Sequence, residues 1–506
     1  MESFCESNLY RMMLTVCAVY DESALRRLLA AAGRWCARQA DTSAVLGVLC
    51  REGAVARSWG SSRLCRLLGA VVNAPGWLLH RIYLALKGPL DGSWFFNLAF
   101  SVGDETAIAE SWLIMLLWVI PYSHWKNTYN LLGFVLLLAI FYLRGMRTGA
   151  RLDVEAAGFY PALLFGAACL AVVFSSYRSL SMRFLIYHLV CVICVLITVS
   201  AVRNAEDLKR LAAGAGFAVL VTSLYGVYQR IQGVEVKQSY VDLTVNKGMP
   251  GRVESIFDNP NTFAEVLILL LPLLVALALD SRHGISRLLA AGAFVLGVTA
   301  LGMTYSRASW VGIACAALVF VFLWRPSWIP AFLVLCLMCV PLMPQTIWNR
   351  ILTITNTSDS STASRIPLYQ AALATIKSSP ISGAGLGTTT VQEYIAAHNL
   401  YHAEAPYVHA HDIYLELWVE AGILGFVGFM SSMLWNIKQA ARQVRHCAHT
   451  PSRTITCACC ASLCGSMVAG LADYLWNYPR VMSIFWFVFA LTIAGIKVCR
   501  IENQKG

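Results

Sequence analysis

The sequence has 506 residues, of which 58% are hydrophobic and 13% are charged, about half the charged share of an ordinary soluble protein. The mean hydropathy is +0.61, so the chain cannot cover itself with a polar surface in water. These values exclude a soluble enzyme, a DNA-binding factor and a disordered scaffold, and they indicate a polytopic membrane protein. The formal net charge of +11 is what basic cytoplasmic loops produce, so we expect no nucleic acid among its partners.

Residues 1–106 precede the first predicted span and have no assigned function. The start of the chain carries Glu2 and Glu6 and lacks the basic-then-apolar order of a cleavable signal peptide, so the first span is expected to act as the insertion signal. The stretch 63–87 mixes basic and apolar residues around Trp77. It is expected to lie on the inner membrane surface, or else to be a poorly specified tail.

The rest of the chain predicts an all-α membrane protein with about twelve transmembrane helices, because apolar runs near the length that crosses a bilayer recur along it. The predicted spans are 107–122, 129–143, 159–176, 184–202, 211–228, 262–280, 286–304, 310–324, 328–345, 412–436, 456–475 and 481–498.

The charges of the connectors predict the orientation. Connectors 144–155, 203–210, 281–287 and 437–455 are short and basic, so they are expected in the cytoplasm together with both termini. The predicted division is an N-terminal cytoplasmic or interfacial region at 1–106, helices 1–9 at 107–345, an outer loop at 346–411, helices 10–12 at 412–498 and a cytoplasmic tail at 499–506.

The chain has 17 cysteines, but none lies in the long outer connectors 229–261 and 346–411. This pattern indicates unpaired thiols and argues against a disulfide framework. The cluster of four cysteines at 457–464 resembles a zinc site in spacing, yet it lies inside an apolar span, where cysteines serve as small packing residues. We therefore expect no metal and no cofactor.

Polar residues collect where three spans begin at the outer face. Span 6 follows Arg252 and an Asn-Pro-Asn turn, in which Asn261 is expected to cap the helix. Span 8 follows Ser306, a second expected cap, and Arg307. Positive helix N-termini and guanidinium groups together favour a phosphate or diphosphate. Taken singly, an arginine at a span end is more often an interfacial anchor, and an Asn-Pro-Asn sequence is more often a plain turn.

Span 10 begins after His409 and His411. A neutral imidazole can accept a proton from a hydroxyl group, the general-base role, although a histidine in a loop is more often only solvated. Two residues apart on a helix, these side chains would face different directions, so at most one is expected in a site if the helix has already begun. Glu416 and Glu420 lie four apart on one helical face, where hydrogen bonding between spans is the simpler interpretation.

The outer loop contains Arg365 and a glycine-rich segment with Gly385 and Gly387. Glycine lets a backbone approach a ligand closely, but a glycine-rich turn is more often only a loop.

The segments GRVESIFDNPNTFAE, TYSRASWVG, SSPISGAGLG and HAHDIYLELWVEAGILG, in this order around a long outer loop, resemble the O-antigen ligase and polymerase superfamily over roughly 120–498. LYGVYQRIQGVE and TYSRASWVG also resemble a branch once described as cyanobacterial bicarbonate transporters.

The resemblance implies a metal-independent glycosyltransferase of the GT-C type in a bacterial inner or plasma membrane. Such enzymes move a glycan from an undecaprenyl-diphosphate carrier to an acceptor hydroxyl on a glycan or glycolipid. In this interpretation Arg252 and Arg307 hold the diphosphate, and His411 activates the acceptor hydroxyl. His409 is the second candidate for the role of His411. Arg365, Asn261, Gly385 and Gly387 shape the substrate site. The family pattern has His-Asn where this chain has His411-Asp412, so the role of Asp412 is open.

Two rival functions remain at this stage. A transporter for bicarbonate or another small anion would place charged residues near the bilayer midplane, whereas Glu265, Glu420 and Asp473 lie toward the outer half. A structural partner in a glycan export complex would make the arginines and histidine dispensable. The sequence does not separate ligase from polymerase.

Overall fold

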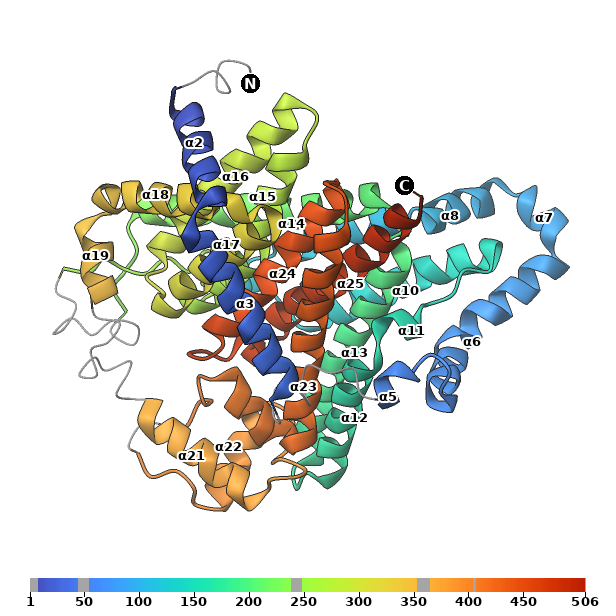
Figure 1. Cartoon of the computed structure of the whole chain (residues 1–506). Coiled ribbons are helices and arrows are strands. Elements are labelled where there is room, and N and C mark those ends of the chain that lie inside the picture. Colours follow the sequence, from blue (N-terminus) through green and yellow to red (C-terminus); the bar gives the residue numbers. More distant parts are fainter. Residues whose placement is uncertain (1–7, 44–53, 238–247, 353–364, 404–405, 506) are drawn as a thin grey trace.

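A computed structural model describes the chain except for residues 1–7, 44–53, 238–247, 353–364, 404–405 and 506 (Figure 1). Within the described residues every regular element is a helix and no strand is present. The all-α fold class predicted from the sequence is confirmed.

Each predicted span coincides with a helix. In chain order these are α9 (Thr106–Leu117), α10 (Thr128–Thr148), α12 (Phe159–Phe174), α13 (Arg178–Ala201), α14 (Ala205–Gln232), α15 (Pro260–Asp280), α16 (Gly284–Met303), α17 (Arg307–Trp324), α18 (Ile329–Cys339), α23 (Ile413–His446), α24 (Pro451–Ala469) and α25 (Pro479–Lys505). In the described part of the chain, 8 helices are long and apolar enough to cross a membrane, and α9, α12 and the region of α18 are shorter apolar helices. The chain is a multi-pass membrane protein.

The helix ends differ from the predicted spans at two places that matter for the site. The predicted span 456–475 ends early, because α24 stops at Ala469 and residues 470–474 form a loop before the short helix η4 (Leu475–Asn477). The predicted span 328–345 contains only the short α18 and a 3₁₀ turn at Val340–Leu342. Pro330 lies in the first turn of α18, and Pro341 lies in the 3₁₀ turn that follows it. The loop at 470–474 is the more important result, since it carries a side chain that a continuous helix would place elsewhere.

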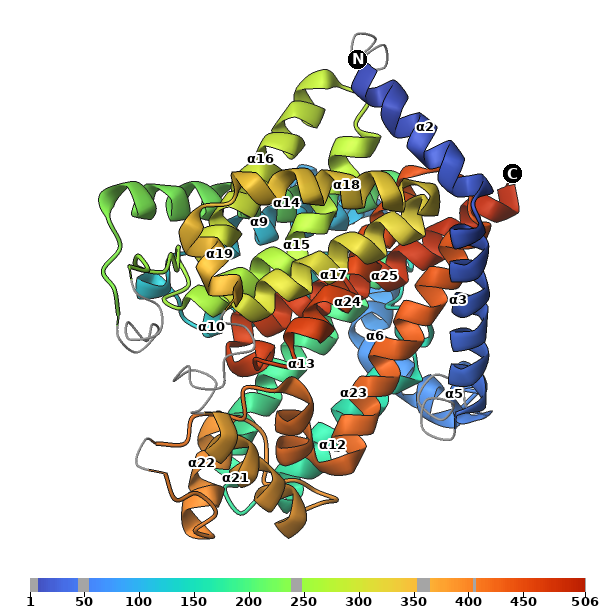
Figure 2. The same ribbon diagram turned by 60° about the vertical axis from the view of Figure 1, so that its left-hand side comes forward.

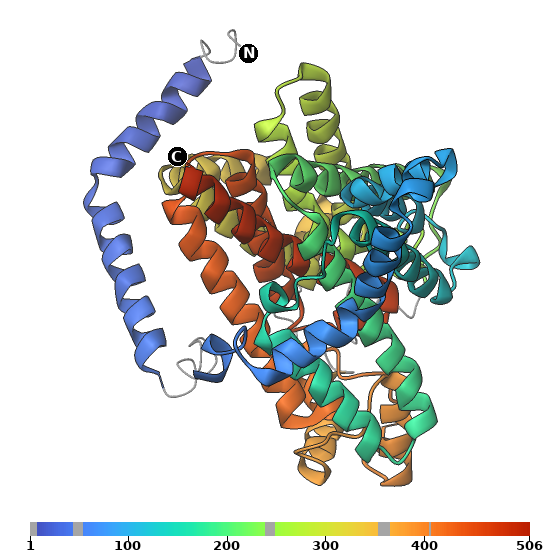
Figure 3. The same cartoon turned by 90° about the vertical axis from the view of Figure 1, so that its right-hand side faces the viewer.

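The N-terminal region is helical and only partly attached to the bundle. It comprises α2 (Asn8–Glu22), α3 (Ala24–Thr42), α5 (Ala54–Arg57), α6 (Arg63–Ala85), α7 (Lys87–Asp91) and α8 (Trp94–Asp104). Helix α6 packs against α10, where the Tyr142 hydroxyl donates to the Val72 carbonyl. Helices α2 and α3 form an arm that stands beside the bundle in Figure 3.

The core of the bundle is built around α24, which packs against α15, α17 and α25. Gly312 of α17 and Gly465 of α24 face each other so closely that a Cβ on either would lie 2.6–2.8 Å from the carbonyl oxygen of the other. Cys457, Cys459 and Cys460 are buried and free in this packing. They act as small packing residues, as the sequence predicted, because helices in a membrane approach closely where side chains are small.

The predicted outer loop is largely helical. It contains α19 (Gln345–Leu352), α21 (Arg365–Ser378) and α22 (Thr388–Ala397), and α21 and α22 form a lobe at the lower edge of Figures 1 and 2. Backbone bonds join this lobe to α23, from Ala384 N to Val419 O (2.7 Å) and from Ile423 N to Pro380 O (3.0 Å). Gly422, with φ of 64°, interrupts the helix there, which frees the backbone groups that pair with the loop.

Candidate functional site

An arginine-lined cavity of about 340 Å³ opens where α15, α17, α19 and α21 begin or end. We call it the arginine pocket, and the residues that define it are Arg252, Asn261, Arg307, Arg350, Arg365 and Asp473. Four guanidinium groups from four separate segments therefore line one small cavity. All the arginines that the sequence singled out are among them.

The start of α15 holds two of these residues in place. Asn259, not Asn261, caps the helix, since its side chain accepts from the backbone N–H of Asn261 and Thr262, and Pro260 fills the first helical position. The expected cap is thus wrong by two residues. Asn261 instead accepts a hydrogen bond from the Arg252 guanidinium. The Arg252 Nε also donates to the Thr304 carbonyl at 2.6 Å, so it is fixed to the turn that precedes Arg307.

Arg307 and Arg365 are the first residues of α17 and α21. A helix N-terminus carries partial positive charge and favours an anion, so a cation placed there is electrostatically unfavourable by about 0.3–1 kcal/mol. Ser306 is the N-cap of α17 as predicted, but its side chain makes no cap hydrogen bond. Both the helix ends and the arginines thus present positive charge to the same cavity, and an anion would relieve this repulsion.

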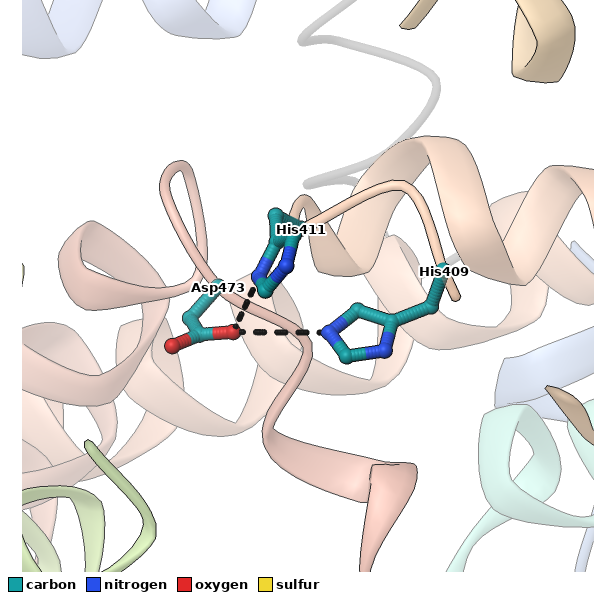
Figure 4. A group of neighbouring side chains, drawn as sticks. All are labelled: His409, His411 and Asp473. Carbon is teal, nitrogen blue, oxygen red and sulfur yellow. Dashed lines mark hydrogen bonds and ion pairs between the residues drawn. The ribbon is translucent and has the colours of Figure 1, made fainter. Parts of the chain in front are cut away.

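The two histidines meet a single carboxylate beside the pocket (Figure 4). The His411 Nδ1 lies 2.9 Å from the Asp473 Oδ1, and the His409 Nε2 lies 3.7 Å from the same oxygen. The two imidazole centroids are 4.1 Å apart. Because α23 begins only at Ile413, the helical argument that kept the histidines apart does not apply, and both reach one site.

Buried hydrogen bonds shape the segment that carries the histidines. The Glu416 carboxylate accepts from the Ala410 N–H at 2.7 Å and from the Tyr407 hydroxyl at 3.4 Å. Asp412 caps α23 by accepting from the Tyr414 and Leu415 N–H groups. Aspartate and asparagine are comparable caps, so the His-Asp variation retains this structural role.

His411 has φ of 48°, in the left-handed region that only glycine adopts easily. Ser255, Asp258, Tyr305 and Asn399 share this conformation, and Tyr305 lines the arginine pocket. Each such residue costs about 1–3 kcal/mol. The strain at Tyr305 and His411 therefore lies beside the candidate site, which is common at functional sites.

Asp473 is the electrostatic link between the histidines and the arginine pocket, whose wall it also forms. Burial alone would raise the pKa of its carboxyl, but the hydrogen bond with His411 and the proximity of the His409 imidazole hold the pKa well below its usual value. Asp473 is therefore an ionised acceptor. An imidazole that donates its Nδ1–H to this carboxylate keeps Nε2 as the basic nitrogen.

The same three side chains have the types and spacing of a metal site, since their donor atoms lie within 4.8 Å of one another. A second such group, Cys447, Cys499 and Glu502, lies at the far end of the bundle. There Glu502 already accepts from Thr450 and Ser452. Geometry alone permits a cation at His409, His411 and Asp473, and chelation is the test between this and a hydrogen-bonded pair.

Gly385 and Gly387 lie away from the arginine pocket. A Cβ on Gly387 would lie 2.0 Å from the Phe184 ring, and one on Gly385 would lie 2.3 Å from the Ser175 hydroxyl. Both glycines have positive φ, which is 114° at Gly385 and 88° at Gly387. In this structure they let the loop pack against the end of α12 and against α13, and their predicted contact with the substrate stays a prediction.

Asp473 and Arg350 are site residues that the sequence analysis did not select. The sequence gives Asp473 only as a charge near the outer half of the predicted span 456–475. That span was expected to be one continuous helix, so no loop was expected at Asp473. Arg350 is 4% exposed and lies in the apolar sequence IWNRIL. A charged residue in such a stretch was the available signal, since buried arginines almost always face a partner or a site.

The comparisons with known proteins agree with this arrangement. Residues 292–430 match a family model described as O-antigen ligase. The match contains Arg307, Arg350, Arg365, His409 and His411. A search of curated proteins finds no match to the chain.

Proposed function

We propose that this chain, which is similar to the O-antigen ligase family over residues 292–430, transfers a glycan from an undecaprenyl-diphosphate carrier to an acceptor hydroxyl at the outer face of the membrane. The ligase type, which joins a finished glycan to a glycolipid or another acceptor, is the preferred reaction. A polymerase of the same superfamily, which joins the glycan to another repeat unit, is the alternative.

In the proposed reaction the arginine pocket holds the diphosphate of the donor. His411 accepts the proton of the acceptor hydroxyl as its oxygen bonds to the anomeric carbon. The bond between that carbon and the diphosphate oxygen breaks, and undecaprenyl diphosphate leaves with the electron pair. The arginines stabilise the charge that develops on the leaving oxygen. Asp473 orients His411 and stabilises the imidazolium. No metal is required for any of these steps.

The observation that carries the proposal is the proximity of an arginine-lined cavity to a histidine pair through one residue. Asp473 lines the cavity and lies 2.9 Å from His411. The proposed transfer needs a site for the diphosphate leaving group and a base for the acceptor hydroxyl, both close to the reacting sugar. The arginine pocket and the histidine pair are candidates for these two groups.

We further propose that the protein lies in a bacterial inner or plasma membrane with both termini in the cytoplasm. The basic connectors support this orientation. It places the arginine pocket and the lobe of α21 and α22 at the outer surface, where a translocated lipid-linked glycan is available.

A small-anion transporter is the second candidate. One buried acid on the opposite half of the bundle favours it, since Glu110 of α9 is buried and accepts a hydrogen bond from Thr198 of α13. Glu265, Glu416 and Glu420, however, lie in the first two turns of α15 and α23, on the side of the arginine pocket. Most of these buried acids therefore lie at the end of the bundle that holds the arginine pocket. This favours a reaction site near the membrane surface over a transport path through the middle of the bundle.

The decisive experiment is a deletion of the gene followed by size separation of surface glycans. Complementation uses the wild type and His411→Ala. The transferase proposal expects a lost or shortened polysaccharide that only the wild type restores. Accumulated free polymer indicates a ligase, and single repeat units indicate a polymerase. Unchanged glycans with poor growth at low inorganic carbon would support the transporter.

A further inference from the structure

A second cavity, of about 610 Å³, adjoins the arginine pocket on the outer side of the bundle. Its wall is rich in aromatic residues, and we call it the aromatic pocket. The rings that line it are Tyr122, Trp125, Phe184, Tyr187, Phe257 and Tyr478. Between them lie hydrogen-bonding side chains, including Asn127, Arg183, Thr389 and Asn477. Its volume lies within the roughly 300–1,000 Å³ range of ligand sites.

The two pockets lie on opposite sides of shared walls. At the start of α15, Asn261 lines the arginine pocket while the next residue, Thr262, lines the aromatic pocket. In the segment after α24, Asp473 lines the first pocket and Asn477 lines the second. The carboxylate that holds the histidines is thus four residues along the chain from a polar group of the aromatic pocket.

The aromatic pocket is held in shape by protein contacts. Arg480 lies between two of its rings, with its guanidinium carbon 4.6 Å from the ring centroids of Trp125 and Phe257. The Trp125 Nε1 donates to the Asn127 Oδ1 at 3.0 Å, and the Asn127 amide donates to the Tyr187 hydroxyl at 3.3 Å. Thr388 donates to Asn477 at 2.9 Å. These contacts fix the walls before any ligand enters.

This combination of groups suits a sugar. The C–H faces of a pyranose ring pack on aromatic faces, which carry partial negative charge. Its hydroxyl groups both donate and accept, and asparagine side chains offer both partners. An acyl chain would instead be expected in a cavity with few polar groups. A diphosphate would be expected in the arginine pocket, with its four guanidinium groups.

We propose that the aromatic pocket binds the acceptor glycan. This inference rests on the proposed function. Attack at the anomeric carbon requires the acceptor oxygen to approach from the side opposite the departing diphosphate, within reach of His411. With the diphosphate in the arginine pocket, the aromatic pocket is close enough to hold the non-reacting sugars of the acceptor, because neighbouring residues of the same segments line the two cavities. The reacting hydroxyl then extends from the aromatic pocket to the reaction centre.

The test uses the full-length protein in nanodiscs with Tyr122→Ala and Arg183→Ala. Tyr122 is 48% exposed, and its backbone N–H, which bonds the Ile256 carbonyl, is unaffected by the substitution. The expected result is a rise of about tenfold in the KM for acceptor, the effect of losing one aromatic contact. The KM for the lipid-linked donor should be unchanged. Tyr122→Phe keeps the ring and should behave like the wild type.

Tyr228→Ala is the matched control. Tyr228 is 54% exposed on α14, outside both pockets, so this variant should leave both KM values unchanged. An increase in donor KM alone for Tyr122→Ala would overturn the assignment, because the pocket would then bind the donor glycan. Unchanged KM values in both pocket variants would also overturn it.

A binding measurement separates this inference from the proposed function. Oligosaccharides released from the source organism's envelope by mild acid are titrated into the His411→Ala protein, and tryptophan fluorescence is followed. Saturable binding that Tyr122→Ala and Arg183→Ala weaken supports a glycan site even if no transfer is detected. Absence of saturable binding overturns the glycan site, even if the wild type proves to be a transferase.

Discussion

Several buried or partly buried arginines lie in the first turn of a helix in this protein, and their guanidinium groups have different surroundings. Arg453, in the first turn of α24, donates from Nε to the Val444 carbonyl at 2.7 Å and from Nη2 to the Leu323 and Trp324 carbonyls at 3.1 Å, at the C-terminal ends of α23 and α17. Arg480, in the first turn of α25, donates to the Ile120 carbonyl at 2.8 Å, just beyond α9. Arg307 and Arg365 also begin their helices, but their side chains line the arginine pocket.

The surroundings of the guanidinium group separate a structural arginine from a candidate functional one. The Arg453 and Arg480 side chains reach carbonyls at the C-terminal ends of other helices, where they meet partial negative charge and satisfy carbonyls that lack helical partners, so these contacts stabilise the fold. The Arg307 and Arg365 side chains line a cavity that other arginines share. Positive charge accumulates there, and in the proposed function the diphosphate offsets it.

The largest expected effect is at the arginines that line the arginine pocket. Arg307→Ala should reduce transfer by about 10²–10³-fold, the effect of removing one preorganised charge from a leaving-group site. Its thermal stability should be unchanged or higher, since a like-charge repulsion is removed. Arg453→Met should do the opposite, lowering stability by about 1–3 kcal/mol because buried carbonyls lose their donors. Transfer assays and thermal unfolding in detergent measure both. Equal loss of stability in the two variants would contradict the distinction.

His411→Ala should lower the transfer rate by about 10²–10⁴-fold, the usual contribution of a general base. The fold should persist, since Asp412 and Glu416 hold the segment independently of the imidazole. His398→Ala, on the exposed end of α22, is the control and should be fully active. Normal activity in a well-expressed His411→Ala protein would exclude the proposed base.

Asp473→Asn should reduce transfer less, because the amide oxygen can still accept a hydrogen bond from the His411 imidazole but carries no charge to stabilise the imidazolium. It should also change how stability depends on pH. The pKa of the Asp473 carboxyl is held well below its ordinary value of 3.8, so the stability that this carboxylate contributes is present above the ordinary value and is lost as the pH falls through the lowered pKa. Unfolding curves recorded against pH check the sign. The wild type should lose more stability at acidic pH than Asp473→Asn, and an equal loss in both proteins would refute the pairing.

Gly387→Ala should affect stability and leave donor binding alone. With φ of 88° and Phe184 in the way, we expect a loss of about 1–3 kcal/mol. The KM for the donor should match the wild type in the folded fraction, whereas the KM for the acceptor should rise, because Phe184 lines the aromatic pocket. A raised donor KM without loss of stability would return this glycine to the donor site.

Chelation should have the smallest effect. The proposed reaction uses no metal, so EDTA followed by gel filtration should leave the rate unchanged. Loss of activity that zinc or manganese restores would show that His409, His411 and Asp473 hold a cation.

The sequence predicted the helices and the arginine pocket well because both depend on local signals. Apolar runs of membrane length define the helices, and Arg252, Arg307 and Arg365 stand beside turn sequences at their outer ends. Asp473 and Arg350 required tertiary information. Asp473 reaches the histidines only because α24 ends at Ala469. Gly470 was the available stop signal, but apolar residues follow it and made the span look continuous. The sequence expected the histidines to diverge only if the helix had already begun, and α23 begins after both of them, at Ile413, so their convergence on Asp473 depends on tertiary structure.

The backbone bonds between residues 380–384 and the interruption at Gly422 have a consequence for biosynthesis. The loop segment leaves the ribosome before α23, yet its partners are the backbone groups that α23 exposes where it is broken. In the proposed orientation the lobe of α21 and α22 therefore crosses the membrane before the next helix inserts, and it docks only afterwards. The histidines lie between these two interacting segments in the chain, so the segment that carries them acquires its shape only when that late step is complete.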